Sequence, residues 1–266
     1  MRASQAALVA LQCAALLGLL ALGGWGAAMW TSSAQAQPAA ASYARAEVDP
    51  SPTVLPSPTV LPSPTTLPVP TGVASVIAPA VSISARIDPT WLDTVSSRTG
   101  IPRIALAAYA GAASVLAEQS PRCHLGWNTL AAIGHIESDD GRHGGAVVSD
   151  NGYSSVPIIG PKLDGGAFAG IHDSDGGVWD GDTVWDHAVG PFQFIPQTWR
   201  TWGTDGNGDG QADPYQMDDA ALTAARYLCH AGDLSTGDGW RRAVLSYNHS
   251  ESYVDGVAKM ANSYHY

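Results

Sequence analysis

Residues 127–141 read WNTLAAIGHIESDDG and predict a helix followed by a polar turn. Its apolar residues recur at three- and four-residue intervals, which is the spacing of an amphipathic helix. They are Trp127, Leu130, Ala131, Ile133, Gly134 and Ile136. The polar run from Ser138 to Gly141 predicts that the helix ends at Glu137. A carboxyl group therefore stands where an apolar helix meets a polar loop.

The sequence on both sides of this stretch predicts further helices. Asp88-Pro89 is typical of a helix start, and Ile101-Pro102 opens an alanine-rich segment that runs to about Glu118. Other helical segments are predicted at residues 192–202, 218–231, 240–247 and 253–263. Alternation of β-branched residues is nearly absent, so the predicted fold class is mostly α, with one compact domain over residues 85–266.

A long segment rich in Gly and Asp separates Ser138 from Gly190. Loops of this length without secondary structure are usually functional or disordered. The apolar Ile158-Ile159, Phe168 and Trp179 within it favour an ordered lobe.

Residues 1–36 are predicted to direct export. An uncharged apolar stretch from Ala6 to Trp30 is followed by Ser33-Ala34-Gln35-Ala36, which fits a signal-peptide cleavage site. The stretch is also long enough to span a bilayer, so an uncleaved membrane anchor is the alternative. Both interpretations predict an extracytoplasmic protein, either secreted or anchored to the membrane.

Residues 37–84 are predicted to be a disordered Pro-rich linker. Within them, residues 51–68 read SPTVLP, SPTVLP and SPTTLP. Proline at this density removes backbone donors and favours an extended polyproline II chain. The repeat is interpreted as a passive tether and carries no chemistry of its own.

The predicted domain contains two cysteines, Cys123 and Cys229, while Cys13 lies in the apolar N-terminal segment. In an oxidising compartment such a pair more often forms a disulfide than a metal site or a nucleophile. No Cys-x-x-Cys pair occurs, which argues against zinc and against thioredoxin-like redox chemistry.

The formal net charge of −11 excludes nucleic acid as a natural partner, because phosphate binding requires an excess of Lys and Arg. The same charge gives no general attraction to an anionic cell wall, so a wall ligand would be recognised by shape and hydrogen bonding. Nine Trp and nine Tyr offer aromatic faces and hydroxyls for sugars, although such residues also fill cores.

Glu137 is the candidate catalytic residue. A carboxyl at the end of an apolar helix is partly desolvated, which raises its pKa, and the negative end of the helix dipole acts in the same direction. A carboxylic acid that is protonated near neutral pH is the general acid that glycosidic bond cleavage requires. The alternative is an ordinary solvated glutamate at a helix end.

A second motif, AVGPFQFIP at residues 188–196, places Gln193 between Phe192 and Phe194. The Gln193 amide can both donate to and accept from a sugar, and the phenylalanines offer apolar walls. A third motif, SYNHSESY at residues 246–253, begins at the end of a predicted helix. Local packing and capping are the alternative interpretation of both.

Five motifs together resemble those of lytic murein transglycosylases, in the same order and over roughly residues 100–266. They are IGHIES at 133–138, AVGPFQFIPQTW at 188–199, DGNGDG at 205–210, AARYLC at 224–229 and SYNHSESY at 246–253. The chain is similar to the membrane-bound transglycosylase B type, and within it to an actinobacterial branch. Phe192 and the Asp-rich loop from Asp173 to Asp186 depart from the proteobacterial pattern.

The resemblance implies a lysozyme-like helical fold with peptidoglycan glycan strands as the substrate. It implies that Glu137 is the single acid/base and that no cofactor takes part in catalysis. The residues that it assigns to the glycan groove are Gly190, Gln193, Phe194, Tyr247, Asn248 and Tyr253.

The resemblance also implies a reaction. Glu137 protonates the oxygen between N-acetylmuramate and N-acetylglucosamine, and then takes the proton of the muramyl 6-hydroxyl, so that a 1,6-anhydro ring closes without water. A second carboxylate would instead make a hydrolytic muramidase. Asp139 and Asp140 are the candidates for that carboxylate, but they are interpreted as solvated loop residues.

Residues 205–213 match the first part of an EF-hand loop, with Gly210 at position 6. The candidate calcium ligands are Asp205, Asn207, Asp209, Gln211 and Asp213. Position 12 is Gln216 where a bidentate Glu is expected, and Asp218 or Asp219 would have to compensate. A structural Ca²⁺ is one interpretation, and an Asx-rich turn without metal is the other.

Two further classes of protein stay open on the sequence. One is a non-catalytic wall-binding module that retains the groove. The other is a stalked structural protein built around the loop and the disulfide. Glu137 and Gln193 favour the enzyme, which is predicted to act as a monomer.

Overall fold

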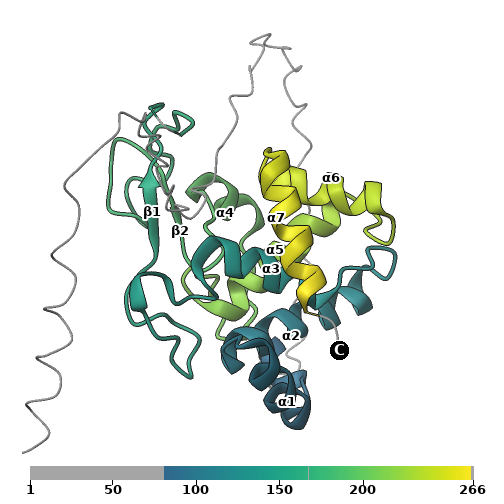
Figure 1. Cartoon of the computed structure of the whole chain (residues 1–266). Helices are drawn as coiled ribbons and strands as arrows, with labels where there is room; N and C mark the ends of the chain where they lie inside the picture. Colours follow the sequence, from purple (N-terminus) through teal and green to yellow (C-terminus); the bar gives the residue numbers. More distant parts are fainter. Residues whose placement is uncertain (1–80, 167, 265–266) are drawn as a thin grey trace, which may run out of the picture. The chain divides into compact units, whose positions relative to one another are not determined.

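The structure is a computed structural model that describes residues 81–166 and 168–264 (Figure 1). The predicted export segment, residues 1–36, and residues 37–80 of the predicted linker lie outside this part. In the described ranges no single helix has both the length and the apolar character needed to cross a bilayer. The α1–α2 pair reaches them together, but is bent by 118°.

Seven α-helices make up nearly all of the regular secondary structure in the described chain, which confirms the predicted mostly α fold class. They are α1 (Pro89–Thr99), α2 (Arg103–Gln119), α3 (Trp127–Ser138), α4 (Pro196–Trp202), α5 (Met217–His230), α6 (Gly237–Tyr247) and α7 (Glu251–Ser263). The short 3-10 helices are η1 (Ile83–Arg86) and η2 (His143–Gly145). The predicted start at Asp88-Pro89 is confirmed, because the Asp88 side chain caps α1 by accepting the Trp91 N–H at 2.8 Å.

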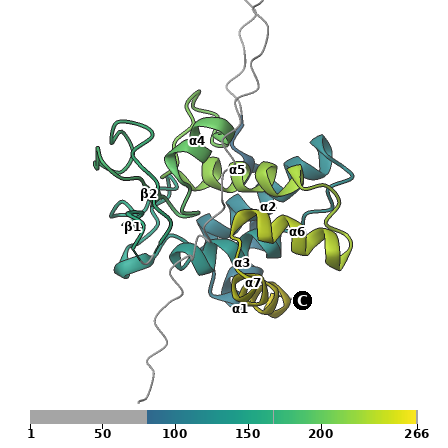
Figure 2. The same ribbon diagram turned by 90° about the horizontal axis from the view of Figure 1, so that it is seen from above.

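The helix α2 forms the centre of the core and packs beside α5, α3, α1 and η1 (Figure 2). Its alanines are buried on several sides, because small side chains allow neighbouring helices to approach closely. One close approach is at Gly111, where a Cβ atom would lie 2.4 Å from the Ile83 carbonyl oxygen. Ser82 and Ser84 also donate hydrogen bonds to Asp218. Within the described part of the chain, packed contacts therefore include Ser82, three residues before the predicted domain start.

The segment between α3 and α4 forms an ordered lobe beside the helices (Figure 1). It contains an antiparallel pair of strands that the sequence did not predict, β1 (Ile159–Lys162) and β2 (His187–Val189). Aspartates make its turns by accepting backbone N–H groups: Asp173 from Asp175 and Gly176, and Asp182 from Val184. The Asp-rich composition of the lobe thus forms turns, as Asx side chains do elsewhere.

The disulfide between Cys123 and Cys229 is confirmed, with a Cα–Cα distance of 5.3 Å. Cys229 lies in the last turn of α5, and Cys123 lies four residues before the start of α3. The bridge therefore ties the approach to α3 to the end of α5.

One predicted helix start is wrong. Residues 192–195 are not the first turn of α4, which begins at Pro196. Instead, Val189 and Phe194 exchange backbone hydrogen bonds of 2.9 and 3.0 Å, and residues 190–193 form a tight loop between them. Gln193 lies in this loop with φ 50°, outside helical geometry.

Candidate active site

Glu137 occupies the last turn of α3 and faces α7. Its Oε1 accepts a hydrogen bond from the Tyr253 hydroxyl at 2.6 Å. Tyr253 is buried in the first turn of α7, and α3 and α7 pack along each other. Glu137 and Tyr253 are 116 residues apart in the sequence. They meet because α3 and α7 pack against each other.

Burial raises the pKa of Glu137 to about 7, whereas the hydrogen bond from Tyr253 lowers it. Desolvation is the larger effect, because a carboxylate loses more hydration on burial than one phenol restores. The predicted direction of the pKa shift is therefore confirmed. A carboxyl group with this pKa can both donate and accept a proton near neutral pH.

A small cavity of about 40 Å³ lies beside Glu137. Its lining residues are Glu137, Gln193, Phe194, Ile195, Thr198, Tyr227, Tyr247 and Asn248. Four predicted groove residues thus meet Glu137: Gln193, Phe194, Tyr247 and Asn248. Glu137 is the one carboxylate among the described residues that line this cavity.

Gly190 does not line the cavity but positions the loop that carries Gln193. Its φ of 75° favours glycine, and a Cβ atom there would lie 1.8 Å from the Pro214 carbonyl oxygen. The Gly190 carbonyl accepts a hydrogen bond from the Gln193 side-chain amide at 3.0 Å. Gly190 therefore acts on the site through Gln193.

The aromatic wall of the cavity is held together by edge-to-face contacts. Tyr247 packs against Phe194 with ring centroids 5.8 Å apart, and against Tyr227 at the same distance. The Tyr247 hydroxyl donates to the Phe192 carbonyl at 2.6 Å, which links the end of α6 to the 190–193 loop. Asn248 follows as the buried residue that ends α6.

Three residues that line the cavity, Ile195, Thr198 and Tyr227, were missed as site residues, and so was Ser138 at the end of α3. Tyr227 lines the cavity, and its signal was present in the AARYLC motif. Ser138 is buried, and its hydroxyl donates to the Pro191 carbonyl at 2.7 Å. Ser138 thereby joins the end of α3 to the loop that carries Gln193. Nothing in the sequence marked this contact, because it joins two segments 53 residues apart.

Phe192 is not an apolar wall of the groove, which corrects the prediction. It is fully buried and packs edge-to-face on Tyr109 of α2, with ring centroids 5.7 Å apart. The positive φ of Gln193 turns the chain sharply after Phe192. Phe192 therefore points into the core, whereas Phe194 lines the cavity.

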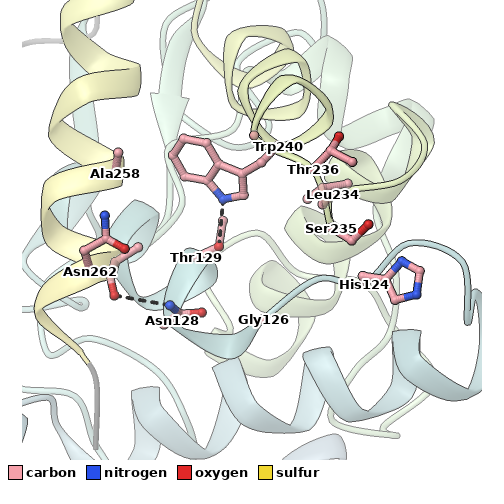
Figure 3. Close-up of a pocket in the computed structure, with 12 residues that line it drawn as sticks. His124, Gly126, Asn128, Thr129, Leu234, Ser235, Thr236, Trp240, Ala258 and Asn262 are labelled. Atoms are coloured by element: carbon pink, nitrogen blue, oxygen red, sulfur yellow. Dashed lines mark hydrogen bonds between the residues drawn. The ribbon is translucent and has the colours of Figure 1, made fainter.

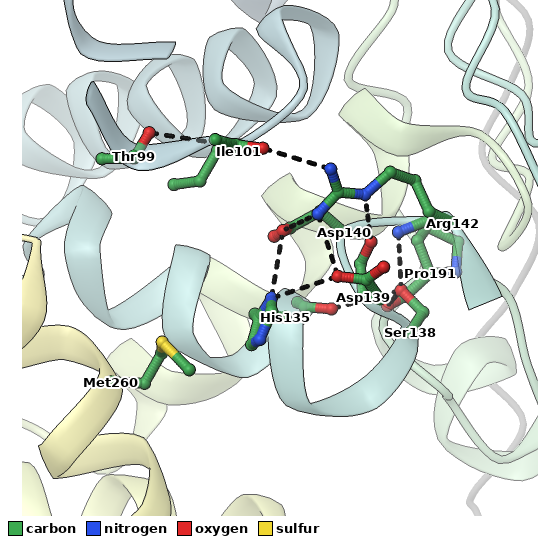
Figure 4. A network of polar contacts seen from close by, with 12 residues as sticks. Thr99, Ile101, His135, Ser138, Asp139, Asp140, Arg142, Pro191 and Met260 are labelled. Carbon is green, nitrogen blue, oxygen red and sulfur yellow. Dashed lines mark hydrogen bonds and ion pairs between the residues drawn. The ribbon is translucent and has the colours of Figure 1, made fainter. Parts of the chain in front are cut away.

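The turn after α3 was only partly predicted (Figure 4). Asp139 is exposed as expected, but Asp140 is 1% exposed, so the interpretation of Asp140 as a solvated loop residue is wrong. Asp140 accepts a hydrogen bond from Tyr109 at 3.2 Å and pairs with His135 and Arg142, each at 3.3 Å. Hydrogen bonding to Asp140 raises the pKa of His135.

The Asp140 carboxylate is enclosed by these partners and does not line the Glu137 cavity. Both aspartates have positive φ, 52° and 57°, and the Asp140 N–H bonds the Gly134 carbonyl at 3.1 Å, as in a Schellman end. The turn therefore has a structural role in ending α3.

The loop at residues 205–213 is closed by its own hydrogen bonds. The Asp205 carboxylate accepts N–H groups from Gly208 and Gly210, at 2.7 and 2.8 Å. Asp219 accepts the Gly206, Asn207 and Asp213 N–H groups, and burial raises its pKa to about 6. Asp219 thus closes the loop.

Gln216 does not serve the loop as a twelfth-position ligand. Its side chain caps α5 by accepting the Asp219 N–H at 2.9 Å. Among the described residues, two groups of three His or acidic side chains have ligand atoms within 4.8 Å of one another. The first is His135, Asp139 and Asp140, and the second is Asp173, Asp175 and Asp186. The second group lies in the Asp-rich loop of the lobe, between Asp173 and Asp186.

Comparison with known proteins identifies part of this region. Residues 180–245 match the family model described as the transglycosylase SLT domain. The matched segment contains the Gln193 loop, the 205–213 loop and Tyr227, and it ends before Tyr247. This match supports an SLT-type transglycosylase domain over these residues, and the described chain around them is mostly helical.

The chain is also similar to a solved structure, that of SltB3 from Pseudomonas aeruginosa in complex with NAG-anhNAM-pentapeptide. The sequence identity is 18% and the TM-score is 0.40. The comparison covers 68% of this chain and 65% of the SltB3 chain, so this chain spans less than two thirds of that structure. No curated protein matches the chain.

Proposed function

We propose that this protein is a peptidoglycan lytic transglycosylase of the membrane-bound transglycosylase B type, within its actinobacterial branch. The carrying observation is Glu137, a single carboxyl with a pKa raised to about 7 beside a cavity lined by aromatic and amide side chains. The match of residues 180–245 to the transglycosylase SLT domain supports the broader part of this proposal, a lytic transglycosylase.

In the proposed reaction Glu137 acts first as the acid. Its carboxyl donates a proton to the oxygen that links N-acetylmuramate to N-acetylglucosamine through a β-1,4 bond, and that bond breaks. The substrate's acetamido group stabilises the anomeric carbon. Glu137, now a carboxylate, accepts the proton of the muramyl 6-hydroxyl, whose oxygen bonds to the anomeric carbon. The product is a 1,6-anhydro ring, and no water is consumed.

Tyr253 assists the second half of this reaction. Its hydroxyl donates to Glu137 and stabilises the carboxylate form, which lowers the pKa. Gln193, Phe194, Tyr247 and Asn248 form the wall against which the sugar binds, and Gly190 holds Gln193 in place. The absence of a second carboxylate among the lining residues described favours the anhydro product over hydrolysis.

The proposed substrate places the protein outside the cytoplasm, in contact with the cell wall. The apolar stretch within residues 1–36 supports export, either as a cleaved signal or as a membrane anchor. Peptidoglycan glycan strands are the proposed partner, and the enzyme acts as a monomer without a catalytic cofactor.

The product distinguishes this proposal from its alternatives. Digestion of purified peptidoglycan is expected to release muropeptides that end in 1,6-anhydro-N-acetylmuramate, each lighter by one water than a hydrolysis product. Mass spectrometry of the soluble fraction measures this difference. Reducing-end products alone would make the protein a hydrolytic muramidase, and binding without products would make it a wall-binding module.

We also propose that the 205–213 loop holds a structural Ca²⁺. Asp205, Asn207 and Asp209 would supply side-chain oxygens as ligands. The Gln211 carbonyl and Asp213 would be the further ligands. Asp205 and Asp209 use carboxylate oxygens as acceptors for backbone N–H groups, and each oxygen keeps a further lone pair for a cation. The ion would stabilise the loop and would take no part in proton transfer.

A further inference from the structure

A second pocket, of about 400 Å³, opens at the opposite end of α3 from Glu137 (Figure 3). The start of α3, the start of α6 and the end of α7 form its walls, with His124, Asn128, Thr129, Ser235, Thr236, Trp240 and Asn262 among the lining residues. Nine residues of helix, about 14 Å at 1.5 Å per residue, separate Asn128 from Glu137. The two cavities share no lining residue.

The walls of this pocket are tied together before any ligand binds. The disulfide holds Cys123 beside α5, and the Leu234 N–H donates to the Cys123 carbonyl at 2.8 Å. The Asp233 carboxylate pairs with His124 at 2.8 Å and accepts the Ser235 N–H at 2.8 Å. These bonds join the segment that carries His124 to the segment that carries Ser235. Walls that are fixed before a ligand arrives lower the entropy cost of binding.

The lining is aromatic and polar but carries almost no charge. The Trp240 indole N–H donates to the Thr129 hydroxyl at 3.0 Å, so the ring has a fixed orientation at the pocket. The Asn128 amide donates to the Ala261 carbonyl at 3.2 Å and keeps a second N–H and its oxygen. The one titratable side chain of the lining, His124, is already paired with Asp233.

This chemistry selects an uncharged ligand with both apolar faces and hydroxyl groups. No Lys or Arg is among the residues that line the pocket, so a phosphate or carboxylate ligand would find no cationic Lys or Arg side chain there. A sugar ring presents C–H groups to an indole and hydroxyls to amides and side-chain hydroxyls. The volume falls within the usual range of about 300–1,000 Å³ for ligand pockets.

We propose that this pocket is a second saccharide-binding site, which holds one uncharged sugar ring of a glycan strand against Trp240, away from the Glu137 cavity. The assignment of the sugar to a peptidoglycan strand rests on the proposed function. The site anchors the wall polymer, and the disulfide stabilises this site.

Nuclear magnetic resonance of the full chain tests the inference directly. The chain has nine tryptophans, each with one indole N–H signal, and Trp240→Phe identifies that of Trp240. The probe is the β-1,4-linked trimer of N-acetylglucosamine, added to the Glu137→Gln protein. We expect a saturable shift of the Trp240 signal with the trimer and none with inorganic phosphate. A Trp240 signal that stays fixed while other signals saturate, or one that moves with phosphate, would overturn the proposal.

A blocking variant separates this site from the catalytic one. Ser235 is exposed at the pocket, so Ser235→Tyr fills the pocket without removing a buried contact. It should abolish the Trp240 shift and weaken binding to insoluble peptidoglycan about fivefold, the effect of losing roughly 1 kcal/mol. Ser263→Tyr, an exposed change outside the lining, should do neither.

Turnover of short soluble glycan fragments completes the design. It should remain at the wild-type level in Ser235→Tyr, because Glu137 and its cavity are unchanged. Normal turnover with no Trp240 shift would refute the second site alone. A Trp240 shift in a wild-type protein that never cleaves glycan would refute the proposed function and leave saccharide binding intact.

Discussion

The last turn of α3 and the turn that follows it place two carboxyl groups three residues apart in opposite environments. Glu137 is desolvated beside a cavity, and the Tyr253 phenol donates a hydrogen bond to it. Asp140 is more deeply buried, yet it is surrounded by Arg142, His135 and Tyr109 (Figure 4).

The comparison shows that burial alone does not make a carboxyl group catalytic. Burial without a nearby cation favours the protonated form and raises the pKa of Glu137. At Asp140 the Arg142 guanidinium, the His135 ring and the Tyr109 phenol all bond the carboxyl group, so the group ties the chain together. Substitutions of these residues should therefore affect activity at one position and stability at the other.

The largest expected effect is on turnover. Glu137→Gln keeps the size of the side chain but removes both proton transfers, each of which is typically worth about 10²–10⁴-fold in rate. We expect activity on purified cell wall to fall by several orders of magnitude, with binding to insoluble peptidoglycan retained. Asp139→Asn, an exposed change in the next turn, should cost far less. Substantial turnover in Glu137→Gln would mean that another carboxylate is the acid.

The next effect is on stability. Asp140→Asn weakens the bonds of a buried carboxyl group to Arg142, His135 and Tyr109, and an imperfectly satisfied buried polar group typically costs about 1–3 kcal/mol. Urea unfolding should report a loss of this order. Asp139→Asn is the matched control, because its ion pairs are exposed and worth at most about 1 kcal/mol. Equal losses in both variants would contradict the structural role of Asp140.

A third effect concerns pH. Glu137 must be protonated to act as the acid, so activity should decline as pH rises through its pKa of about 7. Tyr253→Phe removes the hydrogen bond that lowers this pKa, and the alkaline limb of the pH–rate profile should move up by roughly one pH unit. Tyr247→Phe is the control, because the Tyr247 hydroxyl bonds the Phe192 carbonyl. An unshifted limb in Tyr253→Phe would remove Glu137 as the titrating group.

The same pKa has a consequence for folding. Because the pKa of folded Glu137 exceeds its usual value of 4.5, the folded state binds more protons between about pH 4.5 and 7. The free energy of unfolding therefore loses this contribution as pH rises to 7 and above. Glu137→Gln should flatten that decline, and at pH 8 the variant should be at least as stable as the wild type.

The smallest effect is expected at the 205–213 loop, where backbone N–H groups already satisfy the acidic side chains. Removal of Ca²⁺ by a chelator should lower the melting temperature by a few degrees, since about 1 kcal/mol corresponds to roughly 2–4 °C in a domain of this size. Asp205→Ala should abolish the sensitivity to chelator. Identical melting curves with and without chelator would identify the loop as an Asx-rich turn.

Local signals in the sequence predicted most helices and the catalytic candidate. The Asp88-Pro89 cap and the apolar spacing before Glu137 each involve residues that are close in sequence, so the sequence alone predicts them. The start of α4 was misplaced, because the hydrogen bonds between Val189 and Phe194 compete with helix formation. No local sequence pattern distinguishes a helix that starts at Phe192 from a loop closed by these hydrogen bonds.

The sequence by itself determined the mostly helical class, the cysteine pair and the position of Glu137 at the end of an apolar helix. Only the tertiary structure decided which residues meet there. Tyr253 reaches Glu137 because α7 packs along α3, and Ser138 reaches Pro191 because the loop folds back on the helix end. The tertiary structure likewise buries Asp140 beside Tyr109 of α2, although the sequence predicted a solvated loop residue there. These contacts join segments that are 31 to 116 residues apart, and helical periodicity carries no information over such separations.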